Sequence, residues 1–183
     1  MGRPGSGKET QARLLASKTG YHIFSSGERF RELREHRDSL GQRVKEYYDA
    51  GKLMPAWFAE FLFEEALFKL SPDTGIIFEG TGRKLEEAQL FDEVAAWLGR
   101  TYVVVYLDIS EEEAMKRQLL RAQSKNRPES DSEEKIRMRF EEYNMNTALA
   151  LTFFKGKGLV IDVSGERSVE EIHADICMKL GIA

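Results

Sequence analysis

Residues 1–11 of the chain are MGRPGSGKETQ, in which Gly2, Gly7 and Lys8 fit the frame G-x-x-x-x-G-K. This frame grips phosphate because its glycines let successive backbone N–H groups turn toward the anion. The lysine and the positive end of the following helix then offset negative charge. A glycine–proline turn that only begins a helix is the simpler alternative. The complete run from Arg3 to Gln11 is more specific than such a turn, so we expect a phosphate-binding loop.

The composition indicates one domain without a broad affinity for polyanions. At 183 residues the chain is long enough to bury a core, and its net charge of −4 argues against nonspecific attraction to nucleic acid or to an anionic membrane. A single cysteine, Cys177, excludes an intrachain disulfide and a multi-cysteine zinc site, and its apolar helix face predicts a packed core thiol. The sequence has neither a membrane-length apolar run nor a hydrophobic signal region, so we expect a cytoplasmic protein.

Short β-branched and aromatic runs alternate with longer segments of helical period. The nearly continuous apolar run at 103–107 suits a parallel strand that is covered on both faces. The alternation predicts an α/β fold, a three-layer doubly wound parallel sheet with helices on both faces. Strands are expected at residues 21–25, 75–80, 101–109 and 158–163, and helices at 8–18, 28–35, 40–50, 55–69, 85–98, 111–123, 132–154 and 169–180.

Two segments stand out by composition. Residues 55–69 are too densely apolar for a helix on the surface, so we expect this helix in the core rather than as a platform for nucleotide bases. Residues 122–132 are the most polar stretch and are expected to form a loop. The side chains that support the core position of the helix are Trp57, Phe58, Phe61, Phe63, Leu67 and Phe68.

The sequence resembles the adenylate kinases and their nucleoside monophosphate kinase relatives through nearly the whole chain. The first stretch resembles the family's phosphate loop, G-x-P-G-S-G-K-x-T-Q. SSGERFR at 25–31 is similar to S-T-G-D-x-x-R, GKLMP at 51–55 to G-x-L-V-P, and EGTGR at 79–83 to D-G-F-P-R. The arginines that match those framing and carrying the family's lid are Arg117, Arg121, Arg127 and Arg139. Only the family's first strand has no counterpart. Either the chain starts late relative to the natural protein, which we favour, or another segment fills that slot.

This resemblance implies one kinase domain of the P-loop type over residues 1–183, lacking an evident first strand. An insertion that binds the monophosphate is implied at about 25–55, and a short, zinc-free lid at about 121–132. The implied activity is transfer of the terminal phosphoryl group of Mg-ATP to a nucleoside monophosphate, with AMP as the first candidate. Mg2+ is then the cofactor and ATP the phosphoryl donor. The implied partners are small-molecule nucleotides, with neither nucleic acid nor a membrane, and we expect a monomer.

The resemblance also assigns roles to single residues. ATP would be held by Gly2, Pro4, Gly5, Ser6, Gly7, Lys8, Thr10, Arg117 and Arg121. The monophosphate would be held by Ser26, Gly27, Arg31, Leu53, Met54, Gly80, Arg83 and Glu87. The catalytic residues would be Lys8, Arg83, Arg117, Arg127 and Arg139. Glu28 and Glu79 would hold Mg2+ through water.

The metal site and one turn depart from the family's pattern. Glu28 and Glu79 replace aspartates, which moves both carboxylates one methylene farther out but keeps their charge. Thr81 and Gly82 replace a phenylalanine–proline pair that would fix the turn. We therefore expect an altered metal geometry and a less firmly aimed Arg83.

Two glutamates also depart from the pattern. Glu87 stands where adenylate kinases have a glutamine that contacts the acceptor adenine, so acceptor choice is expected to be less strict. Glu9 stands where the family has glycine, and we expect it to turn outward toward Arg13, four residues on, rather than toward the metal. Two alternative functions stay open: a kinase for pyrimidine monophosphates or another small molecule, and a nucleotide-binding module without turnover. The retained arginines argue against the second.

Overall fold

The computed structural model describes residues 1–124 and 132–182. Its strands are parallel and form two hydrogen-bonded pairs, β1 (His22–Ser25) with β2 (Ile76–Glu79) and β3 (Val104–Asp108) with β4 (Val160–Ser164). The register of the first pair sets Ser25 opposite Glu79, at the carboxyl end of both strands. The loops that leave parallel strands at one edge gather in one region, which is where ligands bind in such sheets.

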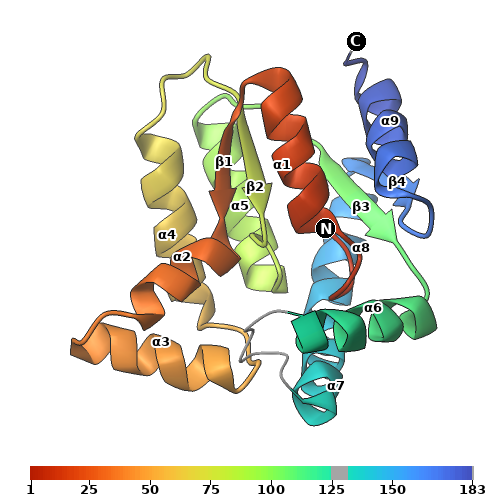
Figure 1. Ribbon diagram of the computed structural model, residues 1–183. Helices are drawn as coiled ribbons and strands as arrows, with labels where there is room; N and C mark the ends of the chain where they lie inside the picture. The colour runs from red at the N-terminus through yellow and green to blue at the C-terminus, as the bar shows by residue number, and fades with distance from the viewer. Residues whose placement is uncertain (125–131, 183) are drawn as a thin grey trace.

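Helices cover both faces of the strands (Figure 1). α1 packs against β1, β2 and α9 on one face, while α5 and α8 pack against each other on the opposite face. This arrangement confirms the predicted α/β class with parallel strands between two helical layers. Cys177 on α9 is buried, as predicted. The α-helices are α1 (Lys8–Thr19), α2 (Ser26–Arg34), α3 (Ser39–Asp49), α4 (Ala56–Phe68), α5 (Leu85–Trp97), α6 (Glu111–Ser124), α7 (Glu133–Glu142), α8 (Ala148–Gly156) and α9 (Val169–Leu180).

The long helix predicted at 132–154 is interrupted. Between α7 and α8 the chain forms a π-helical segment, η2 (Tyr143–Thr147). The Tyr143 ring lies under the guanidinium of Arg3, 5.2 Å from the ring centroid, and its hydroxyl is 3.2 Å from that of Tyr106. The predicted extent of the helix is right and its regularity is wrong. The π turn places Tyr143 against Arg3 of the phosphate loop and Tyr106 of β3, and no helical period encodes such contacts.

The slot between the two strand pairs is partly filled by the first residues of the chain. The backbone nitrogen of Met1 donates to the carbonyl of Val105, and the N–H of Leu107 donates to the carbonyl of Met1 at 2.9 Å. Gly2 pairs with Leu107 in parallel. Within residues 1–124 and 132–182, no other segment forms β-pairing in this slot. The alternative that another segment fills the slot is therefore wrong for the described residues. The phosphate loop thus starts directly from the edge of β3.

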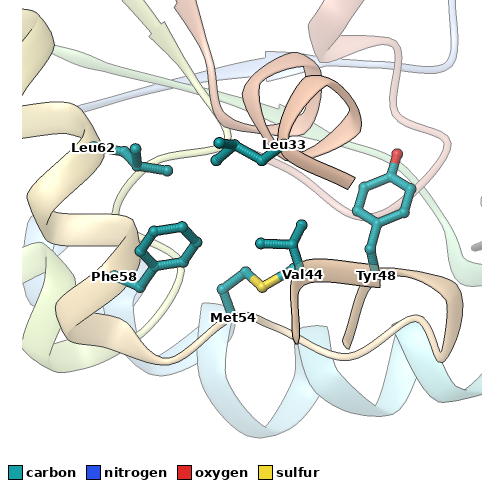
Figure 2. Close-up of a cluster of buried hydrophobic side chains, with 6 residues drawn as sticks. All are labelled: Leu33, Val44, Tyr48, Met54, Phe58 and Leu62. Atoms are coloured by element: carbon teal, nitrogen blue, oxygen red, sulfur yellow. The ribbon is translucent and has the colours of Figure 1, made fainter. Parts of the chain in front are cut away.

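The helices α2 and α3 form an arm that projects from the end of β1 (Figure 1). With the start of α4 they enclose a small apolar core, shown in Figure 2. Burial of this cluster holds the arm together as a packed unit and attaches it to α4. The buried side chains of the cluster are Leu33, Val44, Tyr48, Met54, Phe58 and Leu62.

Helix α4 is only half buried, which corrects the prediction of a core helix. Its buried side chains include Phe58, Phe63 and Leu67. Trp57, Phe61 and Phe68 are 69%, 56% and 55% exposed. The helix packs on α2 and α5, and Phe63 also contacts the ring of Phe78 in β2. Over residues 1–124 and 132–182, no helix combines the length and the apolar character needed to cross a membrane.

Candidate active site

The phosphate loop between Met1 and α1 requires glycine where it approaches α6. Gly5 has a φ of +92°, and a Cβ at this position would lie 2.7 Å from the carbonyl oxygen of Ala114. A left-handed backbone with a carbonyl this close excludes any side chain. Gly7, with a φ of 86°, then caps the N-terminus of α1. The loop is therefore held tightly, with the positive end of α1 directed at the space in front of it.

Lys8, the first residue of α1, lies over the loop. Its Nζ donates to the carbonyl oxygen of Arg3 at 3.2 Å. Burial of the ammonium and the nearby arginines lower the pKa of Lys8 to about 8, against the opposing influence of Glu79. A bound anion would stabilise the charged form of Lys8, because it would offset both the lost hydration of the ammonium and its repulsion by the arginines.

Glu79 ends β2 and lies beside Lys8. It is 8% exposed, and its Oε2 accepts a hydrogen bond from the Ser25 hydroxyl at 2.8 Å, across the strand register. Burial alone would raise the pKa of Glu79, but Arg83, Lys8 and the Ser25 hydroxyl outweigh it and lower the pKa. The carboxylate therefore stays ionised at the edge of the phosphate loop.

The loop, Lys8 and Glu79 face one cavity of about 590 Å³. The cavity continues past Met1 along Ile77 and Val105, into the slot between the strand pairs. Of the predicted site residues, it is lined by Gly2, Pro4, Gly5, Gly7, Lys8, Thr10, Gly27, Arg31, Leu53, Met54, Glu79, Gly80, Arg83, Arg121 and Arg139. The predicted site residues that do not line it are Ser6, Ser26, Glu28, Glu87 and Arg117. Arg127 lies outside the described residues.

Arginines reach this cavity from separate parts of the chain. Arg31 comes from α2, Arg83 follows β2, Arg121 is on α6 and Arg139 on α7. Arg83, Arg121 and Arg139 act electrostatically on Lys8. Arg31 and Arg121 lie close to the carboxylate of Glu9. Planar guanidinium groups of this kind bind phosphate oxygens in pairs.

Two of these arginines are held by residues that sequence reasoning missed. Arg31 donates to the Tyr48 hydroxyl at 3.2 Å, and Arg139 donates to Oε1 of Gln118 at 3.2 Å. Gln118 is 2% exposed and follows the buried Ala114 by one helical turn, and a glutamine on a buried helix face is a signal that could have identified it. Tyr48 gives no such signal, because its ring belongs to the apolar cluster of the arm.

Arg117 is directed away from the cavity. Its Nε donates to Glu113 at 2.8 Å, and its Nη1 donates to the carbonyl oxygen of Gly165 at 2.8 Å. The expectation that Arg117 holds ATP together with Arg121 is therefore wrong for this arrangement. Arg117 ties α6 to the loop after β4, whereas Arg121 lines the cavity.

The turn that carries Arg83 is fixed by Glu87. The backbone N–H of Arg83 donates to Oε2 of Glu87 at 2.8 Å, and Glu87 is 3% exposed. Burial raises the pKa of Glu87, and the hydrogen bond from Arg83 partly counters this. Ser26 also contacts the turn, because its hydroxyl donates to the carbonyl of Gly80 at 2.9 Å. Glu87 thus holds the turn instead of facing the cavity, which corrects its expected role, and it anchors Arg83 despite the missing proline.

Glu28 and Glu9 both lie differently from expectation. Glu28 forms an ion pair with Arg13 and does not line the cavity. Glu9 lines the cavity and accepts a hydrogen bond from Arg121 at 2.9 Å, with Arg13 and Arg31 at 3.8 and 3.9 Å. The expected ion pair with Arg13 is present, but the hydrogen bond of Glu9 goes to Arg121 and its side chain lines the cavity. The expected outward direction is therefore wrong, because the cations of the cavity attract the carboxylate inward.

These features form a site for phosphoryl transfer. A glycine loop at a helix N-terminus, a lysine, an ionised buried carboxylate and arginines from several elements are the groups that position polyphosphates and offset their charge. Their place at the carboxyl edge of parallel strands, between two helical layers, defines a phosphotransferase of the P-loop kinase class.

The sequence model of the adenylate kinase family matches residues 1–159. The adenylate kinase of Thermobifida fusca is 34% identical over 173 residues, which cover 94% of this chain and 91% of the relative. The adenylate kinase of Maricaulis maris is 34% identical over 181 residues, 98% of this chain and 96% of the relative. Adenylate kinase 1 of a Nostoc species is 30% identical over 182 residues, which cover 99% of this chain and 96% of the relative. The chain belongs to the adenylate kinase family.

Proposed function

We propose that the cavity carries out the adenylate kinase reaction, in which the terminal phosphoryl group of ATP passes to the phosphate of AMP and both nucleotides leave as ADP. The observation that carries this proposal is the convergence of Lys8, Glu79 and the arginines on one cavity. Phosphoryl transfer requires the protein to position two phosphate groups, to offset their charge and to exclude water. Membership of the adenylate kinase family supports AMP as the acceptor.

The donor nucleotide is assigned to the phosphate loop and α1. The backbone N–H groups of residues 2–7, the N-terminus of α1 and the Lys8 ammonium hold its terminal phosphates. Arg121 and Arg139 neutralise charge on the transferring group from the opposite side of the cavity. The lowered pKa of Lys8 supports this assignment, since the ammonium is poorly compensated until an anion arrives.

The acceptor is assigned to the arm of α2 and α3, within the region expected at about 25–55. Arg31 and Arg83 hold its phosphate, and Gly27 and Leu53 lie along its base. All four line the cavity, which supports the assignment. The hydrogen bond between Arg31 and Tyr48 connects the phosphate site to the packed core of the arm, so movement of the arm would carry Arg31 with it.

Magnesium would arrive with ATP and supply additional neutralisation of phosphate charge. Glu79 fits the role of holding a metal-bound water, because it is an ionised carboxylate at the cavity wall. Glu28 does not fit that role while it is paired with Arg13. Among residues 1–124 and 132–182, no group of three or more acidic, histidine or cysteine side chains could hold a metal ion. We therefore assign the metal to the nucleotide complex, with Glu79 as its protein contact.

Turnover with Mg-ATP and a panel of AMP, CMP, UMP and GMP tests the proposal. We expect AMP to be the best acceptor and Lys8→Met to lower turnover by at least about a hundredfold, the scale of removing a preorganised charge donor. Lys18→Met, on the exposed last turn of α1, is the matched control. Best turnover with CMP or UMP would favour the pyrimidine kinase instead. ATP binding without turnover on any acceptor would favour the non-catalytic module.

A further inference from the structure

The Glu9 carboxylate lies beside two arginines that the proposed function assigns to different substrates. Its carboxylate accepts from Arg121 of α6 at 2.9 Å and lies 3.9 Å from the guanidinium of Arg31 on α2. The Glu9 side chain is 26% exposed and lines the same cavity as Lys8. One carboxylate on the first turn of α1 therefore contacts one arginine assigned to the donor and lies close to one assigned to the acceptor.

The surroundings of Glu9 explain why the carboxylate stays there. Among the described residues that line the cavity, basic side chains outnumber acidic ones, so the wall carries an excess of positive charge. The basic residues are Lys8, Arg31, Lys52, Arg83, Arg121 and Arg139, and the acidic ones are Glu9, Glu79 and Glu142. A carboxylate inside the cavity offsets that excess in the absence of nucleotide. Carboxylate and phosphate oxygens compete for the same guanidinium donors, so Glu9 holds the place of a substrate phosphate.

A second position for the side chain is available on α1. Arg13 lies one helical turn from Glu9, with its guanidinium 3.8 Å from the carboxylate, and it is 53% exposed. It also pairs with Glu28. When a phosphate takes over Arg121 or Arg31, Glu9 can rotate toward Arg13 and keep a cationic neighbour. The exchange then needs only a side-chain movement.

We propose that Glu9 is a displaceable internal counter-ion that couples the binding of the two nucleotides. This inference rests on the proposed function. Whichever nucleotide binds first must displace Glu9 from the cavity, and the same displacement removes the Glu9 carboxylate from the arginine of the other substrate. The first nucleotide therefore binds more weakly than the cavity would otherwise allow, and the second binds more tightly once the first is in place. Coupling of this kind is reciprocal for ATP and AMP.

Calorimetric titration of the full chain with a non-hydrolysable ATP analogue and Mg2+, with and without AMP, tests the inference, together with the reciprocal titration by AMP. In Glu9→Gln we expect each nucleotide alone to bind about threefold to fivefold more tightly, the scale of a partly exposed ion pair. The enhancement of one nucleotide's affinity by the other should fall by the same factor. Glu9→Asp retains the charge and should retain most of the coupling.

The matched control is Glu32→Gln, which removes a carboxylate paired with Arg29 at 3.0 Å on the outer side of α2 and should change neither affinity. Unchanged single-nucleotide affinities and unchanged coupling in Glu9→Gln, with wild-type circular dichroism, would overturn the role of Glu9 and leave the proposed function intact. Failure of the wild-type chain to bind the ATP analogue, or binding that Lys8→Met leaves unaltered, would instead overturn the proposed function and this inference with it.

Discussion

Lys8 should make nucleotide affinity depend on pH in the alkaline range. In the free protein, burial and neighbouring cations lower the pKa of Lys8 to about 8. Bound polyphosphate favours the ammonium form and returns the pKa toward the ordinary value of a lysine. Because the complex then holds more protons than the free protein above pH 8, binding takes up a proton and affinity falls as the pH rises.

The pKa sets the size of this effect. About half of the Lys8 side chains are charged at pH 8 in the free protein, and about one in eleven at pH 9, by the ordinary titration relation. Affinity for a non-hydrolysable ATP analogue should therefore fall about fivefold from pH 8 to pH 9, and binding at pH 9 should take up about 0.9 proton. The phosphates of ATP are already ionised in this range.

Calorimetry at pH 9 in two buffers of different ionisation enthalpy measures the proton uptake directly. Lys8→Arg is the control, since a guanidinium remains charged and should remove both the uptake and the fivefold change. Binding at pH 9 without proton uptake by the wild-type chain would refute the reasoning. Equal uptake by Lys8→Arg would show that another group titrates.

Three further outcomes are expected from the contacts in and around the cavity. Glu87→Ala should raise the KM for AMP severalfold, because it releases the turn before Arg83. Glu87→Gln should leave the KM unchanged, because its amide oxygen can accept the same N–H, and steady-state kinetics of both variants checks this. Arg31→Ala should mainly raise the KM for AMP and Arg139→Ala should mainly lower kcat; full recovery of Arg139→Ala at saturating AMP would contradict that division. Phe63→Ala should lower the free energy of unfolding by about 3–5 kcal/mol in denaturant titrations, since Phe63 is 0% exposed and packs on two other rings.

Hydrophobic period and turn residues predicted the elements because these patterns depend on local physics. The helix expected at 169–180 is α9, with Ser168 and Glu171 forming a capping box at its start. The strand expected at 101–109 is shorter, Val104–Asp108, because the pairing with β4 and not the apolar run sets its ends. The exposed face of α4 could not be predicted, since an apolar helix does not reveal how many neighbours will cover it.

The glycines and the lysine of the phosphate loop could be singled out from the sequence, because they act through backbone geometry within one short segment. Of the arginines predicted for the site, Arg117 is directed away from the cavity, whereas Arg31, Arg83, Arg121 and Arg139 line it. Arg117 and Arg121 have the spacing of one helix face, yet Gly165 draws Arg117 away while Glu9 retains Arg121. Gly165 and Glu9 lie far from these arginines in the sequence, so the direction of each arginine side chain depends on tertiary structure.

The structure gives Glu87 a role that differs from the one its place in the family pattern suggests. As a replacement for a base-contacting glutamine, it predicted looser choice of acceptor. As a buried carboxylate that accepts the N–H of Arg83, it is a substitute for the rigidity that Thr81 and Gly82 do not supply. The two departures therefore compensate each other, and Glu87 no longer bears on how the acceptor base is chosen. Among the residues assigned to the acceptor base, Gly27 and Leu53 line the cavity, so they are the positions where substitutions should change the preference among AMP, CMP, UMP and GMP.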